Sequence, residues 1–493
     1  MVEESSPVPA ASFKKAEERV EAQSAVFKKE LGLLDVALIQ ILFLLSTTWI
    51  GTAAKIGPAH VLFWLPAIAL FFIPSAVVVV QLNRLMPLEG GLYQWSKLGF
   101  NEFTGFMVGW NYYLSNIVFM ATIGLDAATL LSYVFGPSAG WMTDNKWFIN
   151  LLGLLIVSLL VIIAIFGLGI GKWLYNVGGV VRFTVFAALA ALPFIALARG
   201  SLREFHPLAT TMPALSLFSL NILGKMAFGA FSGFDGVPIF AGECRNPGRT
   251  IARSVIISTP IIALLYLLTT SSVLAFVRPE EIDLIATPQQ VLSVGLRPFG
   301  LDVYVVPVVS LAGFVLLIAV NSILFAQNAR LPMVTGWDHL LPEWFTRLHA
   351  RYKTPINSIA FGGLLVIILG LLSLIGAGYQ EAFQILLNAS FILWALTYLV
   401  MFAIPVIGLR GITPRPPAWL RVVSISGFLM TLLYTVLSIF PIIEVQSIFA
   451  FAAKIIGVII AVNAMGVAIF LVAERRRRNK EQSVELESGK AVV

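Results

Sequence analysis

Long apolar segments recur along the whole chain, and they restrict what this sequence can fold into more than any other feature. The segments around Leu151–Ile165, Val255–Val277 and Phe361–Ile375 are examples, and with their flanks each reaches the ~18 residues that cross a bilayer as a helix. A segment surrounded by lipid must satisfy its own backbone hydrogen bonds, and runs of this length do so as helices rather than as barrel strands. Because only 12% of the 493 residues are charged, against about 25% in soluble domains, lipid must be the solvent for much of the surface.

We predict twelve membrane-spanning helices, an even number that places both ends of the chain on one side. The predicted ranges are 31–57, 61–83, 101–135, 146–169, 172–198, 214–243, 251–277, 302–330, 356–377, 381–408, 420–440 and 446–473. An N-terminal tail (1–30) and a C-terminal tail (474–493) lie outside them, and the basic run Arg475–Arg478 is typical of an anchor near anionic lipid head groups. The first 30 residues are polar, so we expect no cleavable signal sequence.

Lys and Arg are distributed unequally between the two sides of this topology. The loops and tails on the side of the termini carry 24 of them and the opposite side carries 6, while Arg182, Lys225 and Lys454 fall inside spans. Cytoplasmic loops are the ones enriched in Lys and Arg. The sequence therefore predicts a multi-pass protein of the cell membrane (plasma or inner membrane) with both termini in the cytoplasm. The net charge of +7 follows from this placement and does not indicate nucleic-acid binding.

Two of the predicted helices contain residues near the middle of the membrane that disfavour a continuous helix. The residues of the first interruption are Ser46, Thr47, Thr48, Trp49, Ile50, Gly51 and Thr52. Those of the interruption in the sixth helix are Phe231, Ser232, Gly233, Phe234, Asp235 and Gly236. Glycine and the nearby Pro238 loosen the helical hydrogen-bond ladder, and an Asp costs at least ~2.5 kcal/mol at the bilayer centre unless it meets water or a partner. A single span of this kind is explained equally well by a kink that helps helices pack. Two such spans, five spans apart, are what an inverted repeat predicts.

The spacing of these interruptions divides the chain into two inverted repeats of five helices, residues 31–200 and 201–410, followed by two helices in 411–473. In such a repeat the two broken helices face each other, and their half-helix ends offer N–H groups to a carboxylate and carbonyl groups to an amine or a cation. An α-amino acid carries both groups. The two interruptions are therefore our candidate substrate-binding residues.

Other polar residues inside the spans either line the site or join helices. Arg182 lies near mid-depth of the fifth helix, where a charge is by default functional, with a structural ion pair as the alternative. Lys225, Asp126 and Lys454 lie in the outer halves of their spans, where snorkelling to the membrane surface is the alternative to substrate contact. The candidate site-lining amides and hydroxyls are Asn111, Asn321, Ser322 and Asn388. Asn116 and Ser390 are further polar residues of this kind, and each alone is more often a contact between helices than a ligand.

Three stretches of the sequence resemble the amino acid–polyamine–organocation (APC) superfamily of transporters, a likeness that extends over residues ~31–475. Met86–Tyr93 is similar to the family's mPxxGGxY segment, and Phe231–Asp235 with Ala241–Ile251 is similar to its FxGFE and AGEvkNPxRxiP segments. Ala329–Pro355 looks like its aR…D…lP…hxryktP loop. The three occur in the right order and at predicted cytoplasmic helix ends, so the chain resembles an amino acid permease.

The resemblance implies an all-α polytopic fold of two inverted five-helix repeats, with helices 1 and 6 broken and two peripheral helices. It implies a secondary active transporter that holds its substrate between the two breaks and works by alternating access. Arg182 falls where many sodium-independent members carry a basic residue, which favours proton coupling or exchange. Asp235, Glu243 and Arg330 would act in coupling and gating. Helix 1 departs from the family by lacking its Gly-Ser-Gly-like triplet, and Asp235 stands where Glu is commoner.

Two other functions, in addition to a channel, stay open at this point. A carrier of polyamines or organic cations would want acidic groups lining its site, and Asp235 is the only firmly mid-span one, which favours a zwitterion. A non-transporting membrane sensor of the same fold would often carry a soluble domain, which this sequence does not predict. No nucleophile, paired-carboxylate or metal-ligand spacing predicts an enzyme, a cofactor or a metal ion, and we expect Cys244 to be a packing residue. The expected partners are a small-molecule substrate and lipid, with the oligomeric state left open.

Overall fold

The computed structural model describes residues 29–202, 215–284, 286–373, 379–408, 417–442 and 447–490, together with residues 18, 22 and 445. Within this part of the chain the structure is helical, and an isolated bridge between Leu31 and Cys244 is its only β-type pairing. Ten of the described helices are long and apolar enough to cross a membrane, or eleven when the bent pair α2–α3 counts as one span. The predicted class, an all-α polytopic membrane protein, is confirmed.

The first half of the chain supplies five spans. The first consists of α2 (Leu33–Leu44) and α3 (Thr47–Ala54), and the second of α4 (His60–Ala67), the π-helical turn η2 (Ile68–Phe72) and α5 (Ile73–Leu85). The short α6 (Leu92–Gly99) leads into the third span, α7 (Glu102–Met120) with α8 (Ile123–Phe135). After the four-residue α9 (Trp141–Asp144), α10 (Lys146–Phe166) and α11 (Leu168–Ala198) are the fourth and fifth.

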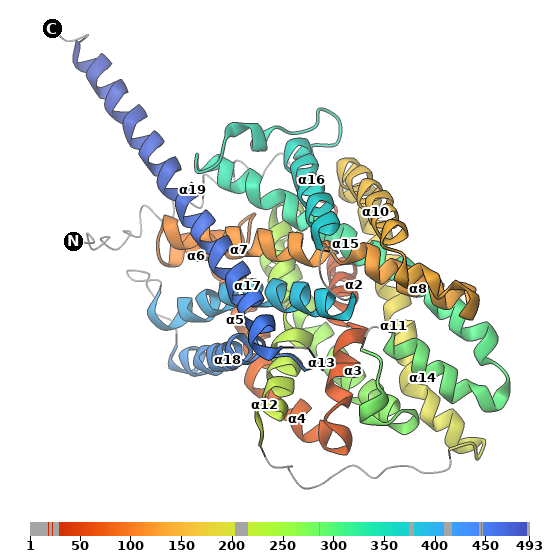
Figure 1. The fold of residues 1–493 in the computed structure, drawn as a ribbon. Helices are drawn as coiled ribbons and strands as arrows, with labels where there is room; N and C mark the ends of the chain where they lie inside the picture. Colours follow the sequence, from red (N-terminus) through yellow and green to blue (C-terminus); the bar gives the residue numbers. More distant parts are fainter. Residues whose placement is uncertain are drawn as a thin grey trace.

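The second half begins with another interrupted span. It contains α12 (Leu217–Gly224), the π-helical turn η4 (Lys225–Gly229) and the 3-10 helix η5 (Phe234–Glu243). The following helices are α13 (Pro247–Phe276), the short α14 (Thr287–Leu296), α15 (Asp302–Trp337), α16 (Ile356–Ser373), α17 (Tyr379–Ile407), α18 (Ala418–Leu437) and α19 (Ile448–Lys490). Figure 1 shows α2 and α3 inside the bundle, with α19 crossing its edge and projecting beyond it.

Two helix ends lie well beyond the predicted ranges. The eighth span runs to Trp337 instead of ending at residue 330. The last helix continues to Lys490, well past the predicted end at 473, because its final turns are rich in Arg, Lys and Glu, which are good helix formers, and Arg478 pairs with Glu474 one turn away. The predicted end of the ninth span, residue 377, lies outside the described residues, and α16 is described to Ser373.

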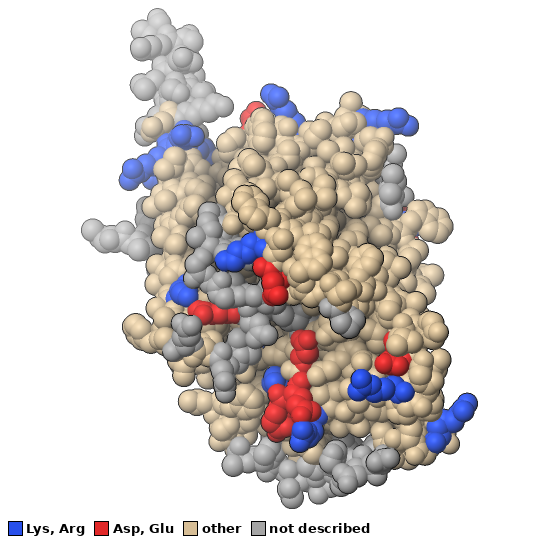
Figure 2. Space-filling view, turned by 45° about the vertical axis from the view of Figure 1, so that its right-hand side comes forward, with Lys and Arg blue, Asp and Glu red and all other residues tan. Residues whose placement is uncertain are grey.

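Large apolar side chains point outward over much of the bundle. Leu155 of α10, Phe194 of α11, Val308 of α15 and Val422 of α18 are all more than half exposed. On the face drawn in Figure 2 uncharged residues predominate and charged side chains are few. An apolar surface of this extent needs a non-aqueous environment, so we assign these faces to lipid. The buried core lies inside the bundle, around the two interrupted spans.

Candidate functional site

The first interruption is a two-residue extended segment in the middle of the first span. Leu45 and Ser46 have extended backbone angles (φ −77°, ψ 108° and φ −125°, ψ 134°), and α2 and α3 meet at 44°. The hydroxyl of Tyr266 on α13 accepts a hydrogen bond from the Ser46 N–H (2.9 Å) and donates one to the Leu44 carbonyl (2.6 Å). A single tyrosine therefore satisfies two of the backbone groups that the break frees.

The N-terminus of α3 has no side-chain cap. Ser46 is its N-cap residue but forms no side-chain capping hydrogen bond. The N–H groups in the first turn of a helix have no partner within that helix, and here they belong to residues that include Thr47, Thr48 and Trp49. These residues line a cavity, so the break presents a helix N-terminus, with its partial positive charge, to the cavity.

The second interruption lies at Ser232 and Gly233. Gly233 has φ 136°, a conformation open only to glycine, and it separates the π-helical turn η4 from the 3-10 helix η5. The hydroxyl of Tyr398 on α17 accepts from the Gly233 N–H (2.8 Å) and donates to Asp235 Oδ1 (2.5 Å), while Trp394 Nε1 donates to Asp235 Oδ2 (3.1 Å). A tyrosine from a neighbouring helix thus supports each break.

A cavity of about 190 Å³ lies between the two interruptions. The first break contributes Ser46, Thr47, Thr48 and Trp49 to its wall, and the second contributes Gly229 and Ser232. The other polar or charged lining residues are Ser115, Asn116, Asp126, Thr129, Arg182, Gln289, Asn321 and Ser390. Gln289 belongs to α14, which follows the end of α13 that lies farthest from Glu243, so the cavity extends from the breaks toward that end.

Two opposite charges in the cavity wall do not pair with each other. Arg182 forms no ion pair among the described residues, and its Nε is buried without a hydrogen-bond partner. Asp126 Oδ2 accepts a hydrogen bond from Thr122 Oγ1 (3.0 Å), and no cationic group of the described chain pairs with it. A buried charge without a partner is costly, so both groups are placed to meet a ligand or water.

Only part of the predicted substrate-binding stretches reaches the cavity. Ile50, Gly51 and Thr52 lie beyond the lining residues of α3, where Gly51 packs against Thr287 and the Thr52 hydroxyl donates to the Thr48 carbonyl (2.9 Å). In the second break, Ser232 lines the cavity. The residues placed behind it are Phe231, Gly233, Phe234, Asp235 and Gly236.

The four predicted site-lining amides and hydroxyls are also divided. Asn321 lines the cavity. Asn111 instead donates to Asn463 of α19 (2.9 Å), Asn388 accepts from the Lys225 ammonium (2.9 Å), and Ser322 is buried outside the cavity wall. Asn111 and Asn388 therefore form contacts between helices, which is the usual role of such groups in membrane spans.

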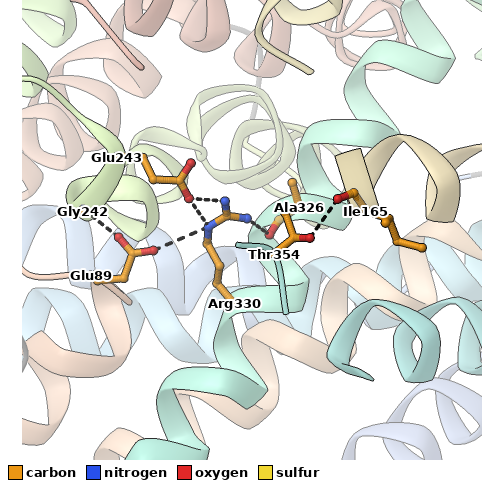
Figure 3. Close-up of polar contacts among 7 residues, drawn as sticks. All are labelled: Glu89, Ile165, Gly242, Glu243, Ala326, Arg330 and Thr354. Atoms are coloured by element: carbon orange, nitrogen blue, oxygen red, sulfur yellow. Dashed lines mark hydrogen bonds and ion pairs between the residues drawn. The ribbon is translucent and has the colours of Figure 1, made fainter. Parts of the chain in front are cut away.

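An ion cluster joins three elements on the tail side of the cavity, which we define as the side of the bundle that holds Leu31 and Glu243. Arg330 of α15 donates to Glu243 at the end of η5 through Nε and Nη2, and its Nε lies 3.5 Å from Glu89 Oε1 (Figure 3). Glu89 Oε2 accepts from the Gly242 N–H (2.7 Å). The predicted gating residues Glu243 and Arg330 are therefore in contact, and Glu89 is a third member that sequence reasoning quoted only as part of a motif.

The aromatic residues that support the two breaks carry no signal in the sequence. Tyr266, Trp394 and Tyr398 lie in apolar spans with no distinguishing spacing, so no pattern marks them. Asn116 and Ser390, noted as polar residues within spans, do line the cavity. A polar residue within an apolar run is thus a sequence signal for some of the lining residues. The aromatic residues that support the breaks show no such signal.

We expect Tyr266→Phe to lower stability, because it leaves the Ser46 N–H and the Leu44 carbonyl unsatisfied in a buried site. Each unsatisfied group costs about 1–3 kcal/mol, so the melting temperature of the purified protein should fall clearly. Tyr304→Phe on the exposed start of α15 is the matched control and should melt as the wild type does. Equal melting of both variants would show that Tyr266 does not support the break.

Comparison with known proteins places this architecture among transporters. A family model described as amino acid permease matches residues 31–469. A probable agmatine/putrescine antiporter, AguD, of Lactococcus lactis is 22% identical over 82% of this chain and 84% of its own length. A branched-chain amino acid permease, BcaP, of Bacillus subtilis is 24% identical over 74% of this chain and 81% of its own.

Among solved structures, the crystal structure of MhsT in complex with L-phenylalanine is similar to this chain. The two superpose with a TM-score of 0.56, over 83% of this chain and 98% of that one, at 15% sequence identity. This likeness shows a shared fold.

Proposed function

Because this chain belongs to the amino acid permease family, we propose that it carries an amino acid across the membrane by alternating access. The family and its relatives make the chain a multi-pass membrane transporter of amino acids or amines. The observation that carries the finer proposal is the polar cavity between two interrupted spans, with the uncapped N-terminus of α3 in its wall.

The cavity wall offers complements to both ends of a zwitterion. The first-turn N–H groups of α3 and the guanidinium of Arg182 favour a carboxylate. Asp126 and the hydroxyl of Ser232 favour an ammonium group. Because one cation and one anion face the same cavity, a net-neutral α-amino acid leaves neither of them unpaired.

We further propose that transport does not depend on sodium. Arg182 places a permanent positive charge in the wall, since a guanidinium stays protonated at any physiological pH. A second cation beside it would be repelled at short range. Proton coupling or exchange of two solutes then supplies the driving force, and Asp235, Glu243 and Arg330 remain our candidates for coupling and gating.

We expect Arg182→Gln to reduce uptake at least tenfold or to make uptake depend on sodium. The neutral side chain no longer attracts the substrate carboxylate, and it no longer repels a sodium ion from the cavity. Uptake into proteoliposomes with and without sodium measures this. Lys454→Gln, which removes an exposed cation paired with Glu381 (2.8 Å), is the control. Wild-type, sodium-independent uptake by Arg182→Gln would remove this residue from the mechanism.

The proposed function is tested with the wild-type protein in two steps. A thermal-shift screen against the standard amino acids and polyamines identifies a ligand, because a ligand at 100 times its Kd stabilises by about 2.7 kcal/mol. The stabilising compound is then loaded into proteoliposomes, and radiolabelled compound is added outside. A carrier produces transient counterflow accumulation, whereas a channel or a non-transporting sensor does not.

An amine carrier is the second candidate, and the observation that favours it is Asp126 in the cavity wall without a cationic partner. An amine substrate would pair with this carboxylate. Arg182→Gln separates the two candidates, since it should abolish stabilisation by an amino acid, whose carboxylate loses its guanidinium partner, and should not weaken stabilisation by a polyamine, which has no carboxylate.

We also propose that the tail side faces the cytoplasm, as the Lys and Arg distribution predicts, and that residues 31–200 and 201–410 are the two inverted repeats. The two tyrosine-supported breaks lie in the first spans of these two segments. Their matching positions support the division.

A further inference from the structure

The ion cluster on the tail side contains one cation and two carboxylates, and all three side chains are buried. Arg330, Glu89 and Glu243 have side-chain exposures of 6%, 0% and 7%. Arg330 also donates to the Ala326 carbonyl (2.7 Å), so its donors are divided between Glu243 and its own helix (Figure 3). Glu89 Oε1 is left buried without a hydrogen bond. The cluster is therefore one positive charge short.

The backbone holds Glu89 in this position. Gly91, which follows it closely, has φ 42°, and a Cβ added there would lie 3.0 Å from the backbone of Pro238 and Ile239. Residues 86–91 thus lie directly against η5, and the Gly242 N–H donates to Glu89 Oε2. The Leu31 and Glu30 N–H groups donate to the Glu243 carbonyl (3.1 and 3.0 Å). The cluster therefore joins the start of the first span, residues 86–91, η5 and α15.

We propose that this cluster is a proton-binding latch: the closed tail side holds one proton on Glu89, and opening of the tail side releases it. The proton neutralises one of the two carboxylates that face a single cation, so the closed cluster carries no net charge. Separation of α15 from η5 exposes both carboxylates to water, where neither retains a proton at neutral pH. This inference rests on the proposed function only in treating the tail-side wall as the part that opens.

The electrostatic surroundings support a proton on Glu89. Burial and the neighbouring Glu243 raise the pKa of Glu89 to about 8, against the opposing effect of Arg330. The titratable or charged groups that face the cluster from the surrounding elements are Lys29 and Glu30 before α2, Tyr175 of α11 and Cys244 after η5. Of these only Lys29 is a cation, and it is exposed, so it does not replace the missing charge. Two carboxylates that share one site do not both ionise readily.

The sign of the pH dependence follows from proton linkage. The closed state binds one more proton than the open state in the interval between the ordinary Glu pKa, about 4.3, and the raised pKa of Glu89, about 8. The closed state consequently loses stability as the pH rises through this interval. The equilibrium constant for opening rises by about tenfold per pH unit. Acid closes the latch and alkali opens it.

Cys244 provides a reporter that needs no substrate. It is the only cysteine of the chain, it follows Glu243 directly, and it is fully buried against Leu31 in the closed latch. Its rate of alkylation by N-ethylmaleimide in the purified full-length protein therefore measures opening. We compare wild type with Glu89→Gln, whose neutral amide reproduces the protonated carboxyl, from pH 5.5 to 7.5. The ratio of the two alkylation rates cancels the pH dependence that comes from ionisation of the Cys244 thiol itself.

The wild-type rate divided by the Glu89→Gln rate should rise by about tenfold per pH unit. Glu343→Gln, which removes an exposed carboxylate on the tail side (77% exposed), should behave as wild type. Arg330→Lys keeps the charge but loses the paired donors, so it should be labelled faster than wild type at every pH. A ratio that does not change with pH, or slow labelling of Arg330→Lys, would overturn the latch. Absent counterflow with the expected labelling would reject the proposed function and leave the latch standing.

Discussion

Gly233→Ala is expected to abolish transport and to destabilise the protein strongly. Gly233 has φ 136°, and a Cβ there would lie 2.6 Å from Phe43 Cδ1 and 3.0 Å from Leu44 Cδ1. The strained backbone costs about 1–3 kcal/mol and the overpacking about 1–3 kcal/mol more. Because Phe43 and Leu44 end the first half-helix and line the cavity, the added methyl group pushes one break against the other.

The matched control for this variant is Gly457→Ala, in the interior of α19. A Cβ at Gly457 meets nothing within 4 Å, and alanine is the better helix former by about 1 kcal/mol. We therefore expect Gly457→Ala to transport normally and to melt at or slightly above the wild-type temperature. Counterflow and thermal melting measure both variants, and normal transport by Gly233→Ala would show that the second break does not need its glycine.

Arg330→Ala is the second variant with a large expected effect. It leaves Glu89 and Glu243 buried with no cation, and loss of one partner of a buried ion pair costs about 3–5 kcal/mol. The variant should express poorly and lose its sharp melting transition. Arg278→Ala, which removes an exposed arginine paired with Glu281 (75% and 53% exposed), should change stability by less than about 1 kcal/mol.

A combined variant separates the charge from the packing of Arg330. When Glu89 and Glu243 are both changed to Gln, Arg330→Met removes no countercharge, and apolar replacements of buried ion pairs are often neutral in stability. We expect the triple variant to melt closer to wild type than Arg330→Ala does. If it melts as low as Arg330→Ala, the cost lies in lost packing against Phe240, whose ring the guanidinium covers (4.5 Å).

The helical class and the place of the two breaks could be read from the sequence because they depend on local properties. Apolar runs of bilayer length predict spans wherever they occur, and Gly233 followed by Pro238 predicts an interruption from backbone chemistry alone. The length of α19 does not follow from hydropathy, since the polar segment beyond residue 473 continues the helix through Arg and Glu residues, which are good helix formers.

The lining of the cavity could not be read in the same way, because it depends on how the helices turn toward one another. A span surrounded by other spans shows no amphipathic pattern, so nothing distinguished Asn321, which lines the cavity, from Asn111, which contacts α19. Asp235 was the natural acidic candidate, but Tyr398 and Trp394 bind both of its oxygens behind the cavity wall. The carboxylate that lines the cavity is Asp126, assigned from the sequence to the outer half of its span.

If a solute binds between the two breaks, it should protect cysteines that are placed there from alkylation. Thr47→Cys and Ser232→Cys place one thiol at each break, and Ser138→Cys places a control thiol on the exposed surface near α9, each in a Cys244→Ser background. The compound that stabilises the wild type most is added at 100 times its Kd, which leaves about 1% of the sites free. We predict that alkylation at both breaks slows by about a hundredfold while Ser138→Cys is unaffected. Equal alkylation at Thr47→Cys and Ser232→Cys with and without the compound would contradict the account.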